Sequence, residues 1–267
     1  METATATGRN VVRVSSVVAF GSRFGKYKPE EEKEVRKIEV KEDEVLRQLK
    51  AAWRRFASAK RSGCEDALKA VGKLKYSAAD VEKFSIALVE FQDESGFGFA
   101  AGYFLSALIN RGGVSDYVIH TRHLAKKIYY LGIENYKNIT VNGDVGGELG
   151  YLMKSRSIIV NGNVESNVGK FMKRGTIIVA GNVDVGVGEY MKGGTIIVNG
   201  NATDGVGTFM GGGAITVQGD ASGEIGFMMY GGEIRIEGEI GRISPTIRGG
   251  KIYHKGKLIV DNGERIS

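Results

Sequence analysis

Residues 176–194 are TIIVAGNVDVGVGEYMKGG and residues 195–213 are TIIVNGNATDGVGTFMGGG, so the second block repeats the first. Working outward from this pair, the same 19-residue period joins three columns of residues without a slip. They are a first glycine column (Gly143, Gly162, Gly181, Gly200, Gly219, Gly238), a second glycine column (Gly150, Gly169, Gly188, Gly207, Gly226) and a methionine column (Met153, Met172, Met191, Met210, Met229). One fixed period over this length indicates a solenoid of stacked, equivalent units.

Each repeat begins with the alternation of a β-strand, as in Ile177, Val179 and Val183, where every second residue is apolar or glycine. A helical repeat is disfavoured because glycine weakens a helix by roughly 1 kcal/mol relative to alanine. Glycine suits corners that need positive φ. At ~3.3 Å per residue the repeat has a contour of about 60 Å, enough for one closed coil of short strands. The sequence therefore predicts a parallel β-helix of roughly six or seven coils.

Four apolar columns are predicted to form the core, because equivalent residues lie one above another in stacked coils. They are Ile139, Ile158, Ile177, Ile196, Ile215 and Ile234; Val141, Val160, Val179, Val198, Val217 and Ile236; Leu149, Val168, Val187, Val206 and Ile225; and Leu152, Phe171, Tyr190, Phe209 and Met228. Burial of one such side chain contributes roughly 1.5–3 kcal/mol. The methionine column is interpreted as core filler rather than a soft-metal track, because methionine packs irregular gaps.

One repeat unit contains Asn201-Ala202, Val206-Gly207, Met210, Gly212-Gly213, Ile215, Val217 and Gly219-Asp220. Units of this form resemble the glycine-rich β-helix domain of glutamate synthase large subunits. They are still more similar to the glycine-rich β-helix subunit of formylmethanofuran dehydrogenase and of the related formyltransferase/hydrolase complex. The resemblance covers about half of the chain, roughly Ile139 to Val260. It implies a right-handed β-helix that carries no catalytic residues and positions catalytic neighbours, and it does not specify a reaction.

Composition divides the chain near residue 131. Only 10 of the 40 glycines precede Leu131, and residues 1–130 carry 23 Lys+Arg against 17 Asp+Glu, whereas the remainder carries 14 of each. We therefore expect an α+β protein with a mainly helical domain at 1–130 and the β-helix at 131–267. The single cysteine, Cys64, excludes an intrachain disulfide. With no apolar run of ~20 residues and no signal-peptide pattern, a cytoplasmic location without membrane contact is the expectation.

Residues 1–130 predict a strand at Val11–Phe20 and then helices. Gly21–Lys26 resembles a phosphate loop, but its glycine spacing is too short and Tyr27 replaces the Ser/Thr that holds magnesium. Predicted helices cover residues 42–60, residues 64–71 and the segment from an N-cap at Ser77 to about Phe91. The basic face of helix 42–60 is interpreted as a solvated face, because no aromatic platform for nucleic acid is interleaved with it.

Gly96, Gly98 and Gly102 form a GxGxxxG pattern that a predicted helix, not a strand, precedes. We interpret it as a loop before a buried helix, Phe99–Ile109, rather than as a dinucleotide site.

The next segment predicts a strand at Val114–Thr121 and a helix at His123–Leu131. We expect this helix to cover the open first coil, because a solenoid end exposes strand edges and core side chains. At the other end, Ser244-Pro245 and Arg248 interrupt the glycine and methionine columns, as expected of a terminal coil.

Two groups of residues are weighed as metal ligands. The position after the first glycine is Asp144, Asn163, Asn182, Asn201, Asp220 and Glu239, which we interpret as corner residues that bond the backbone rather than as a metal ladder. His120 and His123 span a predicted strand end with no cysteine beside them, so zinc is not expected. The sequence predicts no catalytic, cofactor-binding or metal site.

One feature predicts binding. Ile159, Ile178 and Ile197 alternate with the inward columns, so stacking makes them an outward apolar strip. Such a strip is typical of an interface, unless the chain's own N-terminal helices cover it. Two functions remain open. The first is a non-catalytic scaffold that positions catalytic partners in a cytoplasmic oxidoreductase-type complex. The second is an enzyme or small-molecule-binding homo-oligomer with a site between the helical domain and the β-helix.

Overall fold

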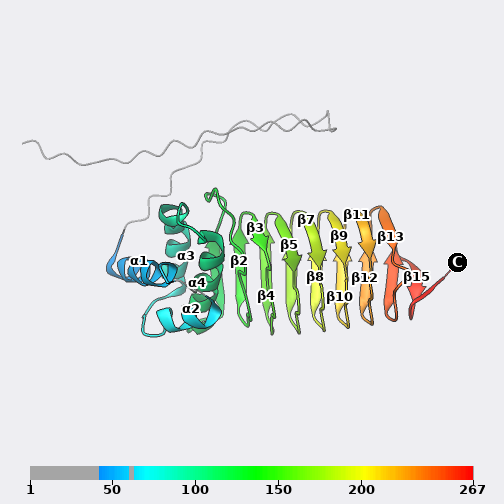
Figure 1. Ribbon diagram of the computed structural model, residues 1–267, viewed down its shortest axis with the longest axis horizontal. Coiled ribbons are helices and arrows are strands. Elements are labelled where there is room, and N and C mark those ends of the chain that lie inside the picture. The colour runs from blue at the N-terminus through cyan, green and yellow to red at the C-terminus, as the bar shows by residue number, and fades with distance from the viewer. Residues whose placement is uncertain (1–41, 60–62, 267) are drawn as a thin grey trace, which may run out of the picture. The chain divides into compact units, whose positions relative to one another are not determined.

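The structure is a computed structural model that describes residues 42–59 and 63–266. The predicted strand Val11–Phe20 and the loop Gly21–Lys26 lie outside the described residues. The described residues belong to one compact unit. Its helices precede a β-solenoid of about seven turns, which confirms the predicted α+β class with a β-helix. Figure 1 shows the helices gathered at the β1–β2 end of the stacked strands.

Four helices form a cap around one aromatic cluster. They are α1 (Glu44–Ala57), α2 (Cys64–Val71), α3 (Ala78–Ala87), continued by the 3-10 helix η1 (Leu88–Phe91), and α4 (Phe97–Arg111). The predicted N-cap is confirmed, since Ser77 and Asp80 bond each other's backbone N–H in a capping box. The side chain of Trp53 is fully buried and lies 5.6 Å from Phe104 between ring centroids.

The solenoid is built from two sheets, whose strands are parallel except at the C-terminal end of sheet A. Sheet A consists of β1 (Asp116–His120), β2 (Asn138–Asn142), β4 (Ser157–Asn161), β6 (Thr176–Val179), β8 (Thr195–Val198), β10 (Ala214–Val217), β12 (Glu233–Ile236), β14 (Lys251–His254), β15 (Lys257–Asp261) and β16 (Glu264–Arg265). Sheet B consists of β3 (Val145–Gly147), β5 (Val164–Val168), β7 (Val183–Val187), β9 (Ala202–Val206), β11 (Ala221–Ile225) and β13 (Ile240–Ile243). The register is constant from β2 to β12 of sheet A, so Ile158, Ile177 and Ile196 pair in successive coils.

Three of the four predicted core columns are confirmed, and the methionine column joins them with no exposed surface. The column of Leu152, Phe171, Tyr190, Phe209 and Met228 is a wrong prediction, because these side chains are partly exposed, and Tyr190 is 36% exposed. All five residues have φ between +48° and +57°. A left-handed residue breaks the strand alternation, so the following methionine fills the interior instead.

The predicted helix at His123–Leu131 is also wrong, because these residues form turns, bends and irregular chain. Tyr130, Gly132 and Glu134 have φ of 60°, 74° and 52°, which repeats the pattern of the corner in the next coil. The segment is therefore part of a coil that begins at β1. Asp116 pairs with Asn138 and Ile139 with Ile158, so this first coil is longer than the 19-residue coils that follow it.

The helices cover the open first coil in place of the predicted segment. Helix α3 packs on β1, and the Ser85 Oγ on α3 accepts a 3.0 Å hydrogen bond from the His120 N–H. Gly98 and Gly102 of α4 lie against the backbone of Lys127 and Tyr129, where a Cβ would collide. Gly98 and Gly102 thus serve close packing of the helix, whereas Gly96 has open space beside it and precedes the helix with φ of 73°. The helix begins at Phe97, before the predicted start at Phe99.

The other end closes with a hairpin. The last parallel rung pairs Glu233 with Lys251, after which β14, β15 and β16 run antiparallel. The predicted atypical terminal coil is confirmed, and Gly256 occupies the β14–β15 turn with φ of 75°.

Candidate functional site

Ile159, Ile178 and Ile197 lie in one row on the outside of sheet A, as the alternation predicts. They are direct partners in the parallel register of β4, β6 and β8. Each is half-buried, whereas the preceding isoleucine of each strand has no exposed surface. The same strand therefore presents one isoleucine to the core and the next to the outside.

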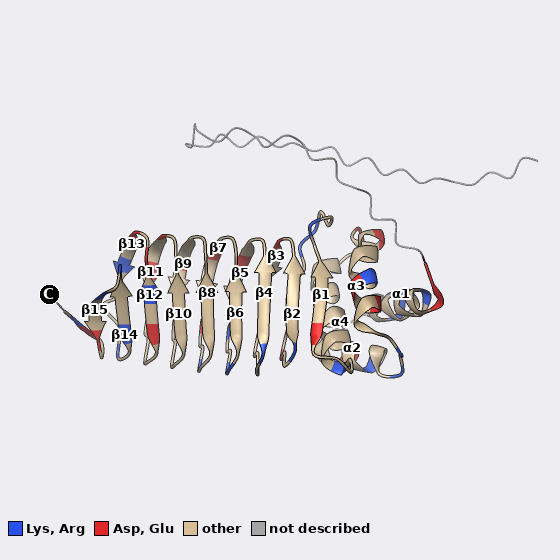
Figure 2. Ribbon diagram, turned by 180° about the vertical axis from the view of Figure 1, so that it is seen from behind, with Lys and Arg blue, Asp and Glu red and all other residues tan. Residues whose placement is uncertain are grey.

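The row sits within a larger uncharged area. We call it the Ile face and define it as the outward residues of β4, β6, β8 and β10, namely Ser157, Ile159, Thr176, Ile178, Thr195, Ile197, Ala214 and Thr216. In Figure 2 the ribbon of β4, β6, β8 and β10 is coloured neither as basic nor as acidic residues. Charge returns on β12, where Arg235 Nε lies 2.6 Å from Glu233 Oε1. The Ile face is thus bounded toward the C-terminal hairpin.

No described helix covers the Ile face. In Figures 1 and 2, α1–α4 gather beyond β1 and leave β4–β10 clear of helices from both sides. Of the two interpretations of the apolar strip, coverage by the protein's own helices is wrong for the helices that the structure describes.

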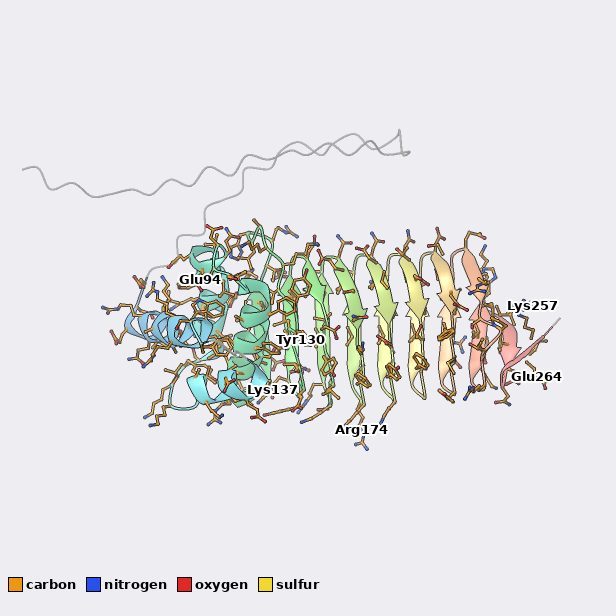
Figure 3. The ribbon with its side chains drawn as sticks, viewed as in Figure 1. Glu94, Tyr130, Lys137, Arg174, Lys257 and Glu264 are labelled. Atoms are coloured by element: carbon orange, nitrogen blue, oxygen red, sulfur yellow. The ribbon has the colours of Figure 1, made fainter. Side chains whose placement is uncertain are left out.

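Basic side chains line one edge of the Ile face. Arg156 precedes β4, Lys173 and Arg174 precede β6, and Lys192 precedes β8, and all four are exposed. Figure 3 shows Arg174 extending outward from its turn. Between residues 63 and 266 none of these four side chains forms an ion pair. We call them the basic row. The sequence analysis missed it, although Lys173 and Lys192 share the spacing of the repeat.

Aromatic rings stack along the turns that come just before the basic row in the sequence of each coil. Tyr190 lies 4.9 Å from Phe171 and 4.7 Å from Phe209 between ring centroids, with interplanar angles of 9° and 4°. Because the rings cover one another's faces, only their edges point outward. Nucleic-acid bases stack on open ring faces, so this stack does not offer such a platform. Ring edges carry the positive end of the aromatic quadrupole.

The column of acidic and amide residues has a structural use. A side-chain oxygen of each coil accepts a 2.8 Å hydrogen bond from the N–H at the same position of the next coil. The first acceptor is Asp144, which bonds the Asn163 N–H, and the last is Asp220, which bonds the Glu239 N–H. The corner interpretation is confirmed, although the bonds join neighbouring coils. Among residues 42–59 and 63–266 no group of three potential ligands could hold a metal ion.

The histidines make local contacts. His120 Nε2 lies 2.8 Å from Glu82 Oε1, and His254 Nε2 lies 3.0 Å from the Gly238 carbonyl oxygen. Burial, followed by the charges of Glu134 and Glu65, raises the pKa of the Cys64 thiol. A raised pKa keeps the thiol protonated near neutral pH, which disfavours nucleophilic chemistry.

The seam between the helices and the first coil is filled by polar contacts. Ser106 Oγ donates to the Tyr130 carbonyl oxygen at 3.2 Å and accepts from the Gly132 N–H at 2.8 Å. Asn110 Nδ2 donates to the Ile133 carbonyl oxygen at 3.0 Å. Two cavities of about 300 and 310 Å³ lie outside these contacts.

No family model matches this chain, and no curated protein matches it. Within the described part of the chain, every helix is too short or too polar to cross a bilayer.

Proposed function

We propose that this chain is a non-catalytic scaffold that holds a partner protein against the Ile face, in a cytoplasmic oxidoreductase-type complex. The observation that carries the proposal is the row of Ile159, Ile178 and Ile197 in an uncharged face that no described helix covers. Contiguous apolar patches on a protein surface typically mark interaction sites. The resemblance to glycine-rich β-helix domains of glutamate synthase and formylmethanofuran dehydrogenase supports the same role.

The size of the Ile face limits how the partner binds. Four strands spaced ~4.8 Å apart, of which β4 has five residues and the other three have four, cover roughly 250 Å². A stable interface needs about 800 Å² on each partner. The partner therefore extends beyond the Ile face, and the basic row is the adjoining edge with unpaired charge in the described residues. We expect the partner to have an apolar centre and an acidic rim.

Site-specific cross-linking tests this function. A photo-reactive amino acid replaces Ile178, and in a matched variant it replaces Asp184, which is exposed on the outside of sheet B. Both variants are exposed to light in extracts of the organism that encodes the chain. We expect one protein to be captured from position 178 and not from position 184.

The capture must depend on the surface described. Adding Ile159→Lys and Ile197→Lys should reduce it at least about tenfold, because two charges are placed in a desolvated apolar contact. Thr203→Lys on sheet B should leave it unchanged. Equal capture from positions 178 and 184 would contradict the proposal. Capture of a second copy of this chain from position 178 would instead favour the self-associating alternative.

A further inference from the structure

The first coil contains a loop that the other coils lack. His120 pairs with Asn142, and the Ile128 carbonyl accepts from the Gly146 N–H, so the extra residues of this coil lie between them. The sequence of the loop is TRHLAKK, from Thr121 to Lys127. In Figure 2 the ribbon of a loop that projects beside β1 and β2 has the colour of basic residues. Insertions in solenoid repeats often form the binding face.

A cavity of about 300 Å³ lies at the base of this loop. Its charged lining residues are Arg122, Lys126, Lys127 and Asp144, so cations outnumber carboxylates by three to one. Lys127 Nζ is shared between Asp144 Oδ2 at 3.7 Å and Glu165 Oε1 at 3.5 Å. Arg122 and Lys126 form no ion pair with any residue that the structure describes. The cavity therefore keeps a net positive charge.

A buried hydroxyl belongs to the same wall. Thr121 is 5% exposed, and its Oγ1 is buried without a hydrogen-bond partner among the described residues. Such unpaired groups are rare in native proteins and call for an explanation. The Oγ1 lies beside Gly143, where an added Cβ would come within 2.6 Å of it. Gly143 has φ of +127° and also lines the cavity, and the loop backbone at Arg122 approaches it so closely that a side chain there would collide.

We propose that this cavity binds a phosphoryl group, as inorganic phosphate or as a phosphate ester. Arg122 and Lys126 supply charge-assisted hydrogen bonds, and Thr121 supplies a hydroxyl donor. A phosphoryl group fits better than a carboxylate, because it carries nearly two charges and three acceptor oxygens at neutral pH. The site lies at the corner that follows sheet A, and the basic row lies at the corner that precedes it. The proposal is therefore independent of the scaffold function.

Isothermal titration of the full chain tests the proposal with two probes, inorganic phosphate and glucose 6-phosphate, at constant ionic strength. We expect saturable binding at one site with a Kd below about 1 mM. Arg122→Gln and Lys126→Gln should each weaken it about tenfold, since each removes a charge-assisted hydrogen bond. Thr121→Val should weaken it by a smaller factor. Whichever probe binds more tightly identifies the source of the group.

Lys192→Gln is the matched control, because it removes one cation from the basic row and leaves the cavity intact. It should not change the Kd of either probe. Circular dichroism establishes that each variant is folded. An absence of saturable binding up to about 10 mM would overturn the proposal. So would an equal loss of affinity in Lys192→Gln and Arg122→Gln, because that result would reflect general surface charge.

Discussion

Ile177 and Ile178 are neighbours in strand β6, yet they belong to different regions of the molecule. Ile177 lies in the inner column with no exposed surface, and Ile178 lies half-buried in the Ile face. Both are repeated one coil before and one coil after, so each forms a row. The inner row is explained by the stability of the coil. We expect the outer row to contribute much less to the stability of the isolated chain, and for this reason we propose that it serves binding.

The largest expected effect separates the two rows directly. Ile177→Ala should lower the free energy of unfolding by about 2–5 kcal/mol, because it leaves a cavity in a closely packed interior. Ile178→Ala should lower it by less than about 1 kcal/mol, as is usual for surface substitutions. Urea denaturation of the two variants measures both values. Similar losses in the two variants would show that the outer row is structural and would remove the main argument for the Ile face.

An intermediate effect is expected at the exposed corner beside the Ile face. Asn182 Oδ1 accepts a 2.8 Å hydrogen bond from the Asn201 N–H, and Asn182→Ala leaves that N–H without its partner. We expect a loss of about 1 kcal/mol in urea denaturation. Asn182→Asp is the matched control, because it keeps the acceptor and aspartate occupies this column at Asp144 and Asp220. If Asn182→Ala and Asn182→Asp lower the free energy of unfolding equally, the hydrogen bonds between corner side chains do not contribute to stability. The contribution of a residue would then depend only on how exposed its side chain is.

An effect of similar size is expected in the helical cap, at the partly buried side chain of Tyr76. Tyr76 Oη donates a 2.8 Å hydrogen bond to the Leu108 carbonyl oxygen, and burial raises the pKa of Tyr76 to about 12. Tyr76→Phe should cost about 0.5–1.5 kcal/mol at neutral pH.

The stability difference between the wild-type protein and Tyr76→Phe depends on pH. The phenol ionises near pH 10 in the unfolded chain, so its contribution is complete below that pH. It is lost as the pH rises towards the folded pKa of about 12. The stability difference between wild type and Tyr76→Phe should therefore narrow between about pH 10 and pH 12. Urea denaturation at pH 8 and pH 11 measures it, and a constant difference would show that Tyr76 is not protected from ionisation.

Most of the β-helix was predictable because a fixed period gives equivalent residues equivalent surroundings. The column at Phe171 was not, since strand alternation fails at corners and bulky residues seldom adopt positive φ. Phe171 and Met172 are both apolar, and only the backbone turn decides which side chain enters the core. The first coil was missed because it lacks the methionine column. The available signal was Gly132, which precedes Gly150 at nearly the interval of the second glycine column.

The two candidate sites also differ in how well the sequence predicts them. The row of Ile159, Ile178 and Ile197 follows from alternation, so the sequence alone predicted its position on the outside. The position of the cavity beside Thr121 cannot be predicted from the repeat, because the path of an inserted loop follows no period. Its basic residues were visible in the sequence, but their approach to Gly143 depends on how the loop crosses the next corner.

The uniform register of the middle coils has a consequence for the dimensions of the molecule. The strands of each repeat unit pair only with strands of the unit before it and the unit after it. Duplicating or deleting residues 176–194 would therefore leave both ends intact and change their separation by one strand spacing, ~4.8 Å. The length of the β-helix therefore changes in fixed steps of one repeat, and the number of repeats in the sequence sets that length.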